Sequence, residues 1–396
     1  MARSLVPAAL LLGNFAVGTS ILAPAGMLPA LSEAFSVTIR EASLLITLGA
    51  VVLGVGTPLV SGWTSRMDRR LLLASSLGII AVAQVASALT DSFGVLLATR
   101  LVMLTAAAPF TPQAAGVVGA LVPVERRAGT IAFVFLGWSL AAALGMPLVS
   151  TLSGRLGIDV TYAVLAGLAL LAFVLVAAHL PRGLRTEPVD LEAWADLVRD
   201  PSVLLLLLIT VLLTAGQFMT FTFLGPLLVR LAQASADAVG VVFALFGLMG
   251  LIGNVTASRI VGRIGPYRTS VAAVLAMVSG AVVWAVGAGS LVVMALGMAI
   301  WGLGFASSNS MQQARLVATA PSYAGASVAL NSSSLYLGQA VGSALGGALF
   351  EHTLDRAIGF GTVGLLLLAL GALALTRPRA RTASVARTEA LSSENA

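Results

Sequence analysis

Long apolar runs separated by short polar turns make up most of this chain. A helix that crosses a bilayer needs about 20 apolar residues, and twelve runs of that length can be marked out. They cover residues 6–30, 42–62, 71–90, 93–120, 128–152, 160–180, 202–224, 237–257, 270–288, 290–313, 325–350 and 357–376. Strands of a membrane barrel are shorter and alternate polar with apolar positions. The pattern therefore predicts an all-α membrane protein with twelve transmembrane helices.

The composition agrees with this prediction. Hydrophobic residues make up 58% of the chain and charged residues only 10%, whereas soluble domains are about 25% charged. The mean hydropathy is +1.01. The first run is longer than the apolar region of a signal peptide, and further runs follow it, so we expect it to be retained.

The basic residues indicate how the chain is oriented. All 22 are arginines, and 17 of them fall on the side of the membrane that holds the N-terminus. Because cytoplasmic loops are enriched in basic residues, both termini are predicted to be cytoplasmic, in a bacterial inner membrane. The arginines lie in short loops and not on one face, which argues against a nucleic-acid partner.

Several classes of chemistry are excluded by the residue types. The chain has no cysteine and only two histidines, and it lacks a phosphate-binding G-x-x-x-x-G-K-[ST] loop. A polytopic membrane enzyme would need clustered acids, His or Cys at a membrane face, and no such cluster occurs. We therefore expect no metal, no cofactor and no enzymatic activity.

The two halves of the chain repeat each other. An offset of 197 residues pairs Pro29 with Pro226, and it also pairs Gly145 with Gly342 and Arg66 with Arg263. The predicted organisation is an N-terminal six-helix bundle over 1–180, a cytoplasmic linker over 181–200, a C-terminal six-helix bundle over 201–376 and a disordered cytoplasmic tail over 377–396. In transporters built from two such repeats, the substrate site lies near the midplane between them.

Four stretches carry a family resemblance. They are GTSILAPAGMLP from position 18, SGWTSRMDRR from position 61, GWSLAAALGMPLVSTLSG from position 137 and GQFMTFTFLGPLL from position 216. Together they resemble the major facilitator superfamily, in the drug:proton antiporter branch that includes sugar-efflux, arabinose-efflux-like and chloramphenicol-efflux proteins. The resemblance implies two six-helix bundles and a monomeric carrier that exports a small organic molecule or drug, coupled to protons, by alternating access.

The resemblance also implies gating residues. In this family the loop after the second helix clamps the cytoplasmic side, and an antiporter motif lies in the fifth helix. The matching residues are Arg66, Arg69, Arg70 and Arg263 for the loop and its repeat, and Gly145 and Pro147 for the motif. The loop has Ser65 where the family has an aspartate.

Proton coupling lacks its expected residue. The family pattern places a glutamate where this chain has Ile21, and none of the sixteen acids lies deep in a predicted helix. Glu41 and Asp237, at the outer mouths of two helices, are the coupling candidates. Protonation of the substrate itself, or transport without protons, stays open.

The candidate substrate-binding residues lie on the first, fourth, seventh and tenth helices, which line the path in this family. They are Asn14, Thr19, Arg100, Gln217, Phe221, Asn309 and Gln313. Arg100 is the one ionisable group well inside a run, and it could hold an anionic or carbonyl-rich substrate by forked hydrogen bonds. The alternative is that Arg100 and the amides tie helices together. A facilitator or importer of a sugar or amino acid without proton coupling, or a receptor that transports nothing, are the competing functions.

Overall fold

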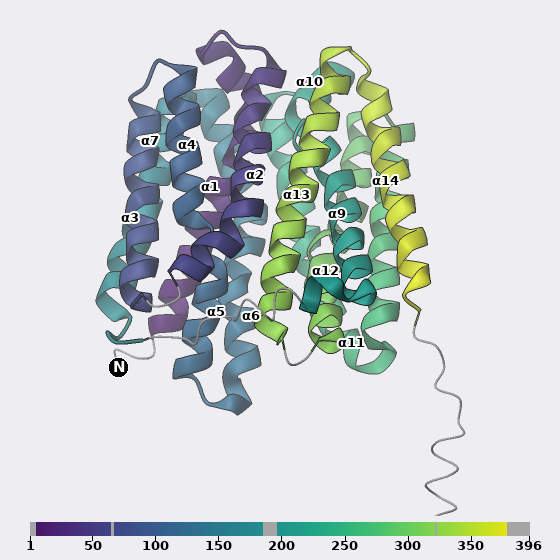
Figure 1. The fold of residues 1–396 in the computed structure, drawn as a ribbon. Coiled ribbons are helices and arrows are strands. Elements are labelled where there is room, and N and C mark those ends of the chain that lie inside the picture. Colours follow the sequence, from purple (N-terminus) through teal and green to yellow (C-terminus); the bar gives the residue numbers. More distant parts are fainter. Residues whose placement is uncertain (1–4, 65–66, 185–195, 321–322, 378–396) are drawn as a thin grey trace, which may run out of the picture.

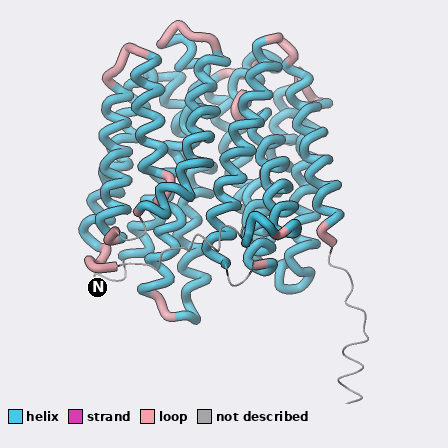
Figure 2. Tube along the Cα trace, in the orientation of Figure 1, coloured by secondary structure: helices cyan, strands magenta, loops and turns pink. Residues whose placement is uncertain are grey.

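The computed structural model describes residues 5–64, 67–184, 196–320 and 323–377. This part of the chain is helical and shows no strand (Figure 2). The helices are α1 (Val6–Ala34), α2 (Ile39–Trp63), α3 (Arg69–Ala88), α4 (Phe93–Ala107), α5 (Phe110–Leu121), α6 (Val124–Leu140), the π-helical turn η2 (Ala141–Gly145), α7 (Met146–His179), α9 (Pro201–Phe221), α10 (Leu224–Ala232), α11 (Ala236–Val286), α12 (Leu291–Thr319), α13 (Ala324–Glu351) and α14 (Asp355–Leu375).

The long helices run roughly parallel in two groups that stand side by side (Figure 1). Helices α1 to α7 form one group and α9 to α14 form the other. The first residues of α1 and the last residues of α14 lie at the same end, which we call the terminal face. The opposite end, where α2 begins and α13 ends, we call the far face.

Nine helical segments of the described residues are long and apolar enough to cross a membrane. Two of them, 129–179 and 236–286, are 51 residues long. At 1.5 Å per residue each would extend about 76 Å, more than twice the thickness of a bilayer core. Each is broken by one glycine with positive φ, Gly157 at 88° and Gly265 at 82°, so each contains two spans joined almost without a loop.

These breaks explain where the sequence-based boundaries differ from the observed ones. The runs predicted as 128–152 and 160–180 belong to helices that continue up to the turn at Gly157. Residues near the turn are too polar to extend an apolar run, yet their backbone remains helical. Helix α13 is not among the nine segments, and the count of twelve spans stays a prediction.

The internal repeat is visible in two close helix contacts. A Cβ atom at Gly145 would lie 2.4 Å from Oγ1 of Thr19 on α1, and one at Gly342 would lie 2.1 Å from the carbonyl oxygen of Ala215 on α9. Only glycine allows these approaches. The two glycines are 197 residues apart and their partners 196, so the same packing recurs in both groups. The bundle, linker and tail boundaries stay predictions, because most of the linker and nearly all of the tail lie outside the described residues.

The surface of the molecule carries many large apolar side chains. Trp63, Val82 and Val286 are 89%, 70% and 73% exposed. Exposure of contiguous apolar surface is unfavourable in water, whereas in a membrane such surface packs against the lipid chains. The burial pattern therefore supports a membrane-embedded protein.

Candidate functional site

Arg100 is buried in α4 and binds three backbone carbonyls. Its Nε donates to Leu45 at 2.8 Å, Nη1 to Ser20 at 3.0 Å and Nη2 to Ile21 at 2.7 Å. The Ser20 carbonyl is available because Pro24, four residues on, has no N–H to donate to it. Arg100 thus joins α1, α2 and α4 at the point where the family pattern would place an acid. Its predicted contact with substrate stays a prediction.

Asn14 belongs to a polar network that joins three helices of the first group. Its Nδ2 donates to the Val134 carbonyl at 3.1 Å, and its Oδ1 accepts from Thr111 at 2.8 Å. The indole of Trp138 donates to the same Thr111 hydroxyl at 3.1 Å. Thr19, five residues further along α1, is fully buried, and its hydroxyl has no hydrogen-bond partner in the described part of the chain.

Gln217 and Phe221 lie within the second group. The Gln217 amide donates to the sulfur of Met277 at 3.6 Å. The Phe221 ring lies against Phe243, Phe246 and Phe305, with ring centroids 5.6, 5.1 and 6.1 Å away. Phe221 is therefore the centre of an aromatic cluster contributed by α9, α11 and α12.

Asn309 and Gln313 lie on α12, nearer the terminal face. Asn309 accepts from Asn331 of α13 at 3.1 Å, and Asn331 in turn accepts from Thr210 of α9 at 2.9 Å. Gln313 is half-buried. The neighbouring Gln312 donates to the Leu206 carbonyl at 3.1 Å. The structure places four of the seven predicted substrate residues in the second group and three in the first, and it does not bring them all to one point.

The gating role predicted for the loop after α2 stays a prediction, and the structure describes part of this loop. Arg66 lies outside the described residues. Arg69 is buried, and its Nη1 donates to the Thr64 carbonyl at 3.1 Å while its backbone N–H donates to Leu184 at 2.9 Å. Arg70 is half-buried and Arg263 is exposed. The loop after α2 is therefore attached to the segment that follows α7.

Asp68 caps the N-terminus of α3 in this loop. Its Oδ1 accepts from the backbone N–H of Arg70 at 2.8 Å and of Leu71 at 3.2 Å, and its Oδ2 accepts from the N–H of Gly183. Partial burial raises the pKa of Asp68, but the bonds from Gly183, Leu71 and Arg70 and the charge of Arg70 outweigh it, so the pKa is lowered. The acid of this loop thus acts as a helix cap.

Two ion pairs join the two groups of helices at the far face. Arg40 at the start of α2 pairs with Glu351 at the end of α13, and Arg155 of α7 pairs with Asp237 at the start of α11, with 2.7 Å between Nη2 and Oδ2. The first group supplies both arginines and the second both acids. The coupling candidate Asp237 is therefore half of an ion pair. Glu41 instead accepts from the N–H of Thr38 at 2.7 Å, at the first turn of α2.

Small residues bring the groups together beside these pairs. A Cβ atom on Gly154 would lie 2.8 Å from that of Ala236, and one on Gly247 would lie 2.3 Å from Cα of Ala143 in η2. Pro147 lies just beyond, at the start of α7, and its carbonyl faces Gly240. Between α2 and α13, Thr47 donates to Ser343 at 2.8 Å.

The repeat relates the four residues of the ion pairs in the sequence, but it does not indicate which of them pair. Arg40 and Asp237 are 197 residues apart, the offset that relates the two halves, and Arg155 and Glu351 are 196 apart. The two pairs are therefore equivalent contacts with the charges exchanged. Helix–helix partners such as Asn331 and Thr111 carried no such signal, because buried amides and hydroxyls occur throughout the runs.

Paired groups of apolar helices, joined by small residues and by equivalent ion pairs, define a multi-pass membrane protein built from two related halves. The model of the Major Facilitator Superfamily matches residues 10–336 and, in a second match, residues 233–394. The chain belongs to this superfamily, whose members transport solutes and are not enzymes.

Similar proteins agree with this assignment. An inner membrane transport protein of Escherichia coli O157:H7, YdhP, is 27% identical over 87% of this chain and 88% of its own length. A probable sugar efflux transporter of Helicobacter acinonychis is 26% identical over 92% of both chains. Among solved structures, the human organic anion transporter TETRAN has a TM-score of 0.75 at 19% identity, covering 94% of this chain and 99% of that one. A bacterial homolog of the human lysosomal transporter Spinster has a TM-score of 0.73 at 16% identity, covering 95% and 97%. At these identities the two structures show the fold alone.

Proposed function

We propose that the protein exports a small, uncharged, hydroxyl-rich molecule of the sugar class from the cytoplasm, as a monomer, by alternating access. The direction and substrate class are supported by relatives described as probable sugar efflux transporters, which match along almost their whole length. The two halves, 1–180 and 201–376, rock against each other about the contacts between α2 and α13 and between α7 and α11.

The distribution of arginines supports the proposed orientation of the chain. Eleven described arginines lie at or near the terminal face and four at the far face. The terminal-face set is Arg69, Arg70, Arg126, Arg127, Arg182, Arg199, Arg259, Arg263, Arg268, Arg315 and Arg377. By the positive-inside rule the terminal face is cytoplasmic in a bacterial inner membrane, and the far face is external.

Closure of the far face by two equivalent ion pairs is the observation that carries the mechanism. Arg40–Glu351 and Arg155–Asp237 both connect one half to the other. A carrier that rocks must break these contacts to open outwards, because their partners lie on opposite halves. In this proposal, the observed arrangement is the state in which the substrate site is shut off from the exterior.

The polar groups between the helices suit a neutral ligand. Half-buried Trp138, Phe305, Asn309 and Gln313 offer amide, indole and aromatic surfaces, which are the groups that fix orientation in sites for small uncharged molecules. The described acids lie at helix ends and loops, not in the membrane interior. An interior carboxylate would favour a cationic substrate, and the described residues offer none.

Proton coupling, in this proposal, acts through Asp237. The carboxylate of Asp237 holds Arg155 across the two halves at the far face, so a change at this residue acts directly on the contact that must open. A facilitator without coupling is the second candidate, and it is favoured by Ile21, which occupies the position of the family's membrane-embedded acid.

The test is a flux measurement in everted membrane vesicles with a panel of radiolabelled mono- and disaccharides. We expect accumulation of at least one sugar to rise when a proton gradient is imposed. Asp237→Asn should lose the gradient dependence, whereas Glu41→Gln, at a site confined to its own helix, should keep it. Equal flux with and without the gradient would establish the facilitator, and no sugar flux above that of empty membranes would refute the substrate class.

A further inference from the structure

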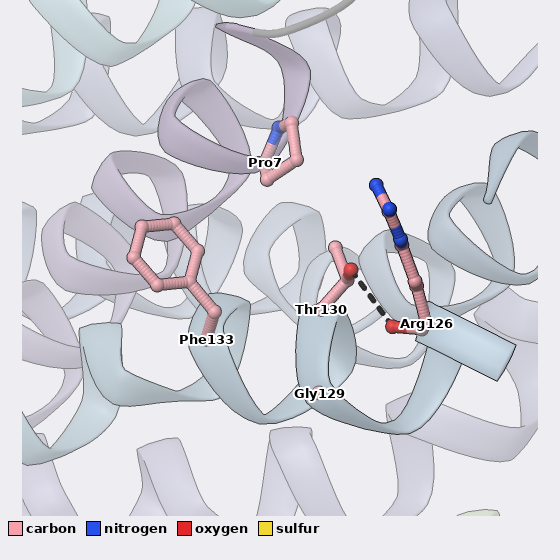
Figure 3. Close-up of a pocket in the computed structure, with 5 residues that line it drawn as sticks. All are labelled: Pro7, Arg126, Gly129, Thr130 and Phe133. Atoms are coloured by element: carbon pink, nitrogen blue, oxygen red, sulfur yellow. Dashed lines mark hydrogen bonds between the residues drawn. The ribbon is translucent and has the colours of Figure 1, made fainter.

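A groove opens between the ends of α1 and α6 at the terminal face (Figure 3). It has a volume of about 350 Å³ and is lined by Pro7 of α1 and by Arg126, Gly129, Thr130 and Phe133 of α6. Pro7 and Phe133 face each other across it, and Arg126 extends along its rim (Figure 3). We call it the α1–α6 groove.

The groove forms because α1 and α6 touch above it and separate below. A Cβ atom at Gly137 would lie 2.5 Å from the Leu11 carbonyl, so the two helices are in backbone contact there. Two turns closer to the terminal face, nothing lies within 4 Å of the corresponding Cβ position at Gly129. The space between the helices therefore widens towards the membrane surface.

The lining residues of α6 lie on the side next to α1, where Gly129 and Phe133 remain exposed. The other sides of this segment are occupied, because Trp138 reaches Thr111 of α5 and Ala143 touches Gly247 of α11. The remaining side carries exposed apolar residues from the groove towards the middle of the membrane. Phe133 is 43% exposed, Leu144 59% and Leu148 44%. These three exposed side chains offer apolar surface to an acyl chain.

The charge at the rim has no counterpart among the described residues. The guanidinium of Arg126 forms no ion pair or hydrogen bond within the described part of the chain, and it is exposed. The adjacent Arg127 differs, since its Nε donates to the Val122 carbonyl at 2.9 Å. Arg126 also lies in the first turn of the 17-residue helix α6, where the helix dipole favours an anion.

We propose that the α1–α6 groove binds one anionic phospholipid, with its phosphate on Arg126 and an acyl chain along Phe133, Leu144 and Leu148. The cationic side chain at the rim and the exposed apolar side chains beyond it match the two ends of such a lipid. Basic pockets between transmembrane helices at the cytoplasmic surface bind lipid headgroups in this way. The site does not depend on the direction or substrate of transport.

The test measures lipid binding to the purified full-length protein in detergent by native mass spectrometry. The protein is titrated with phosphatidylglycerol, and the occupancy of the tightest site is compared between variants. Arg126→Gln should weaken that site about fivefold, the effect of one arginine at a membrane surface. Arg127→Gln removes the same charge one residue away and should change the affinity less than twofold. Equal losses in the two variants would refute the site.

A second pair of variants tests the groove itself. Gly129→Leu fills the groove and should reduce phosphatidylglycerol binding as strongly as Arg126→Gln does. Gly167→Leu is the control, because Gly167 on α7 is also exposed and also has open space at its Cβ position. Equal binding by the two leucine variants would overturn the proposal. Full competition by glycerol 3-phosphate would overturn it as well, since it would show a site for free phosphate and not for lipid.

Discussion

The hydrogen bond between Arg100 and the Ser20 carbonyl can be tested by a double-mutant cycle. Arg100→Met keeps the length of the side chain but removes its donors, so the Ser20 carbonyl loses its partner at 3.0 Å. A buried carbonyl without a hydrogen bond costs about 1–3 kcal/mol. The Tm of a domain of ~200 residues shifts by about 2–4 °C per kcal/mol, so the Tm should fall by roughly 2–12 °C.

Pro24→Ala should partly rescue this loss. An alanine at position 24 supplies the helical N–H that proline lacks, and this N–H reaches the carbonyl four residues earlier, which belongs to Ser20. The loss of unfolding free energy in the double variant should therefore be about 1–2 kcal/mol smaller than the sum of the losses in the two single variants. The assay is thermal unfolding of the detergent-purified protein, followed by size-exclusion chromatography of what remains folded.

Two results would refute this reasoning. Additive losses of stability in the double variant would show that the N–H supplied by Pro24→Ala does not replace the Arg100 donor at the Ser20 carbonyl. An unchanged Tm for Arg100→Met, together with abolished sugar flux, would instead show that Arg100 acts on the substrate and not on the helix packing.

Two further predictions concern the ends of the helices. Asp68→Ala should lower the free energy of unfolding by about 0.5–2 kcal/mol through loss of the α3 cap, and the Tm should fall accordingly. Because the pKa of Asp68 is lowered in the folded protein, the difference in Tm between wild type and variant should be full at pH 6 and should shrink as the pH falls below about 4, where the unfolded state binds the proton first. A constant difference in Tm down to pH 3 would contradict this prediction. Arg155→Asp or Asp237→Arg alone should change sugar flux about two- to fivefold, as expected for an exposed ion pair. The double variant, which exchanges the two charges in one protein, should restore the wild-type rate. A double variant whose flux stays at the level of the single variants would show that the ion pair does not affect transport.

The membrane spans could be predicted from the sequence because they depend on a local property, the length of an apolar run. The almost loop-free breaks could not be placed, since a single glycine at positive φ, such as Gly157, turns the chain without interrupting the helical pattern on either side. Arg100 was identified as the buried charge for the same local reason, because it stands alone inside an apolar run.

The partners of the buried polar residues could not be predicted. Asn14 binds a carbonyl 120 residues away, and which carbonyl it reaches depends on how α1 packs on α6. The far-face ion pairs are an intermediate case. No arginine or acid of these pairs stands out by itself in the sequence. The repeat places Arg40 and Asp237 at equivalent positions of the two halves, but it does not indicate which residue each one contacts.

Opening of the far face is the central claim, and a disulfide across it gives the most direct test. The chain has no cysteine, and Cβ atoms at Gly154 and Ala236, on opposite halves, would lie 2.8 Å apart, so small adjustments reach the ~3.8 Å of a disulfide. The double variant Gly154→Cys/Ala236→Cys should lose sugar flux in everted vesicles on oxidation and regain it on reduction. Undiminished flux through the fully cross-linked protein would contradict the account.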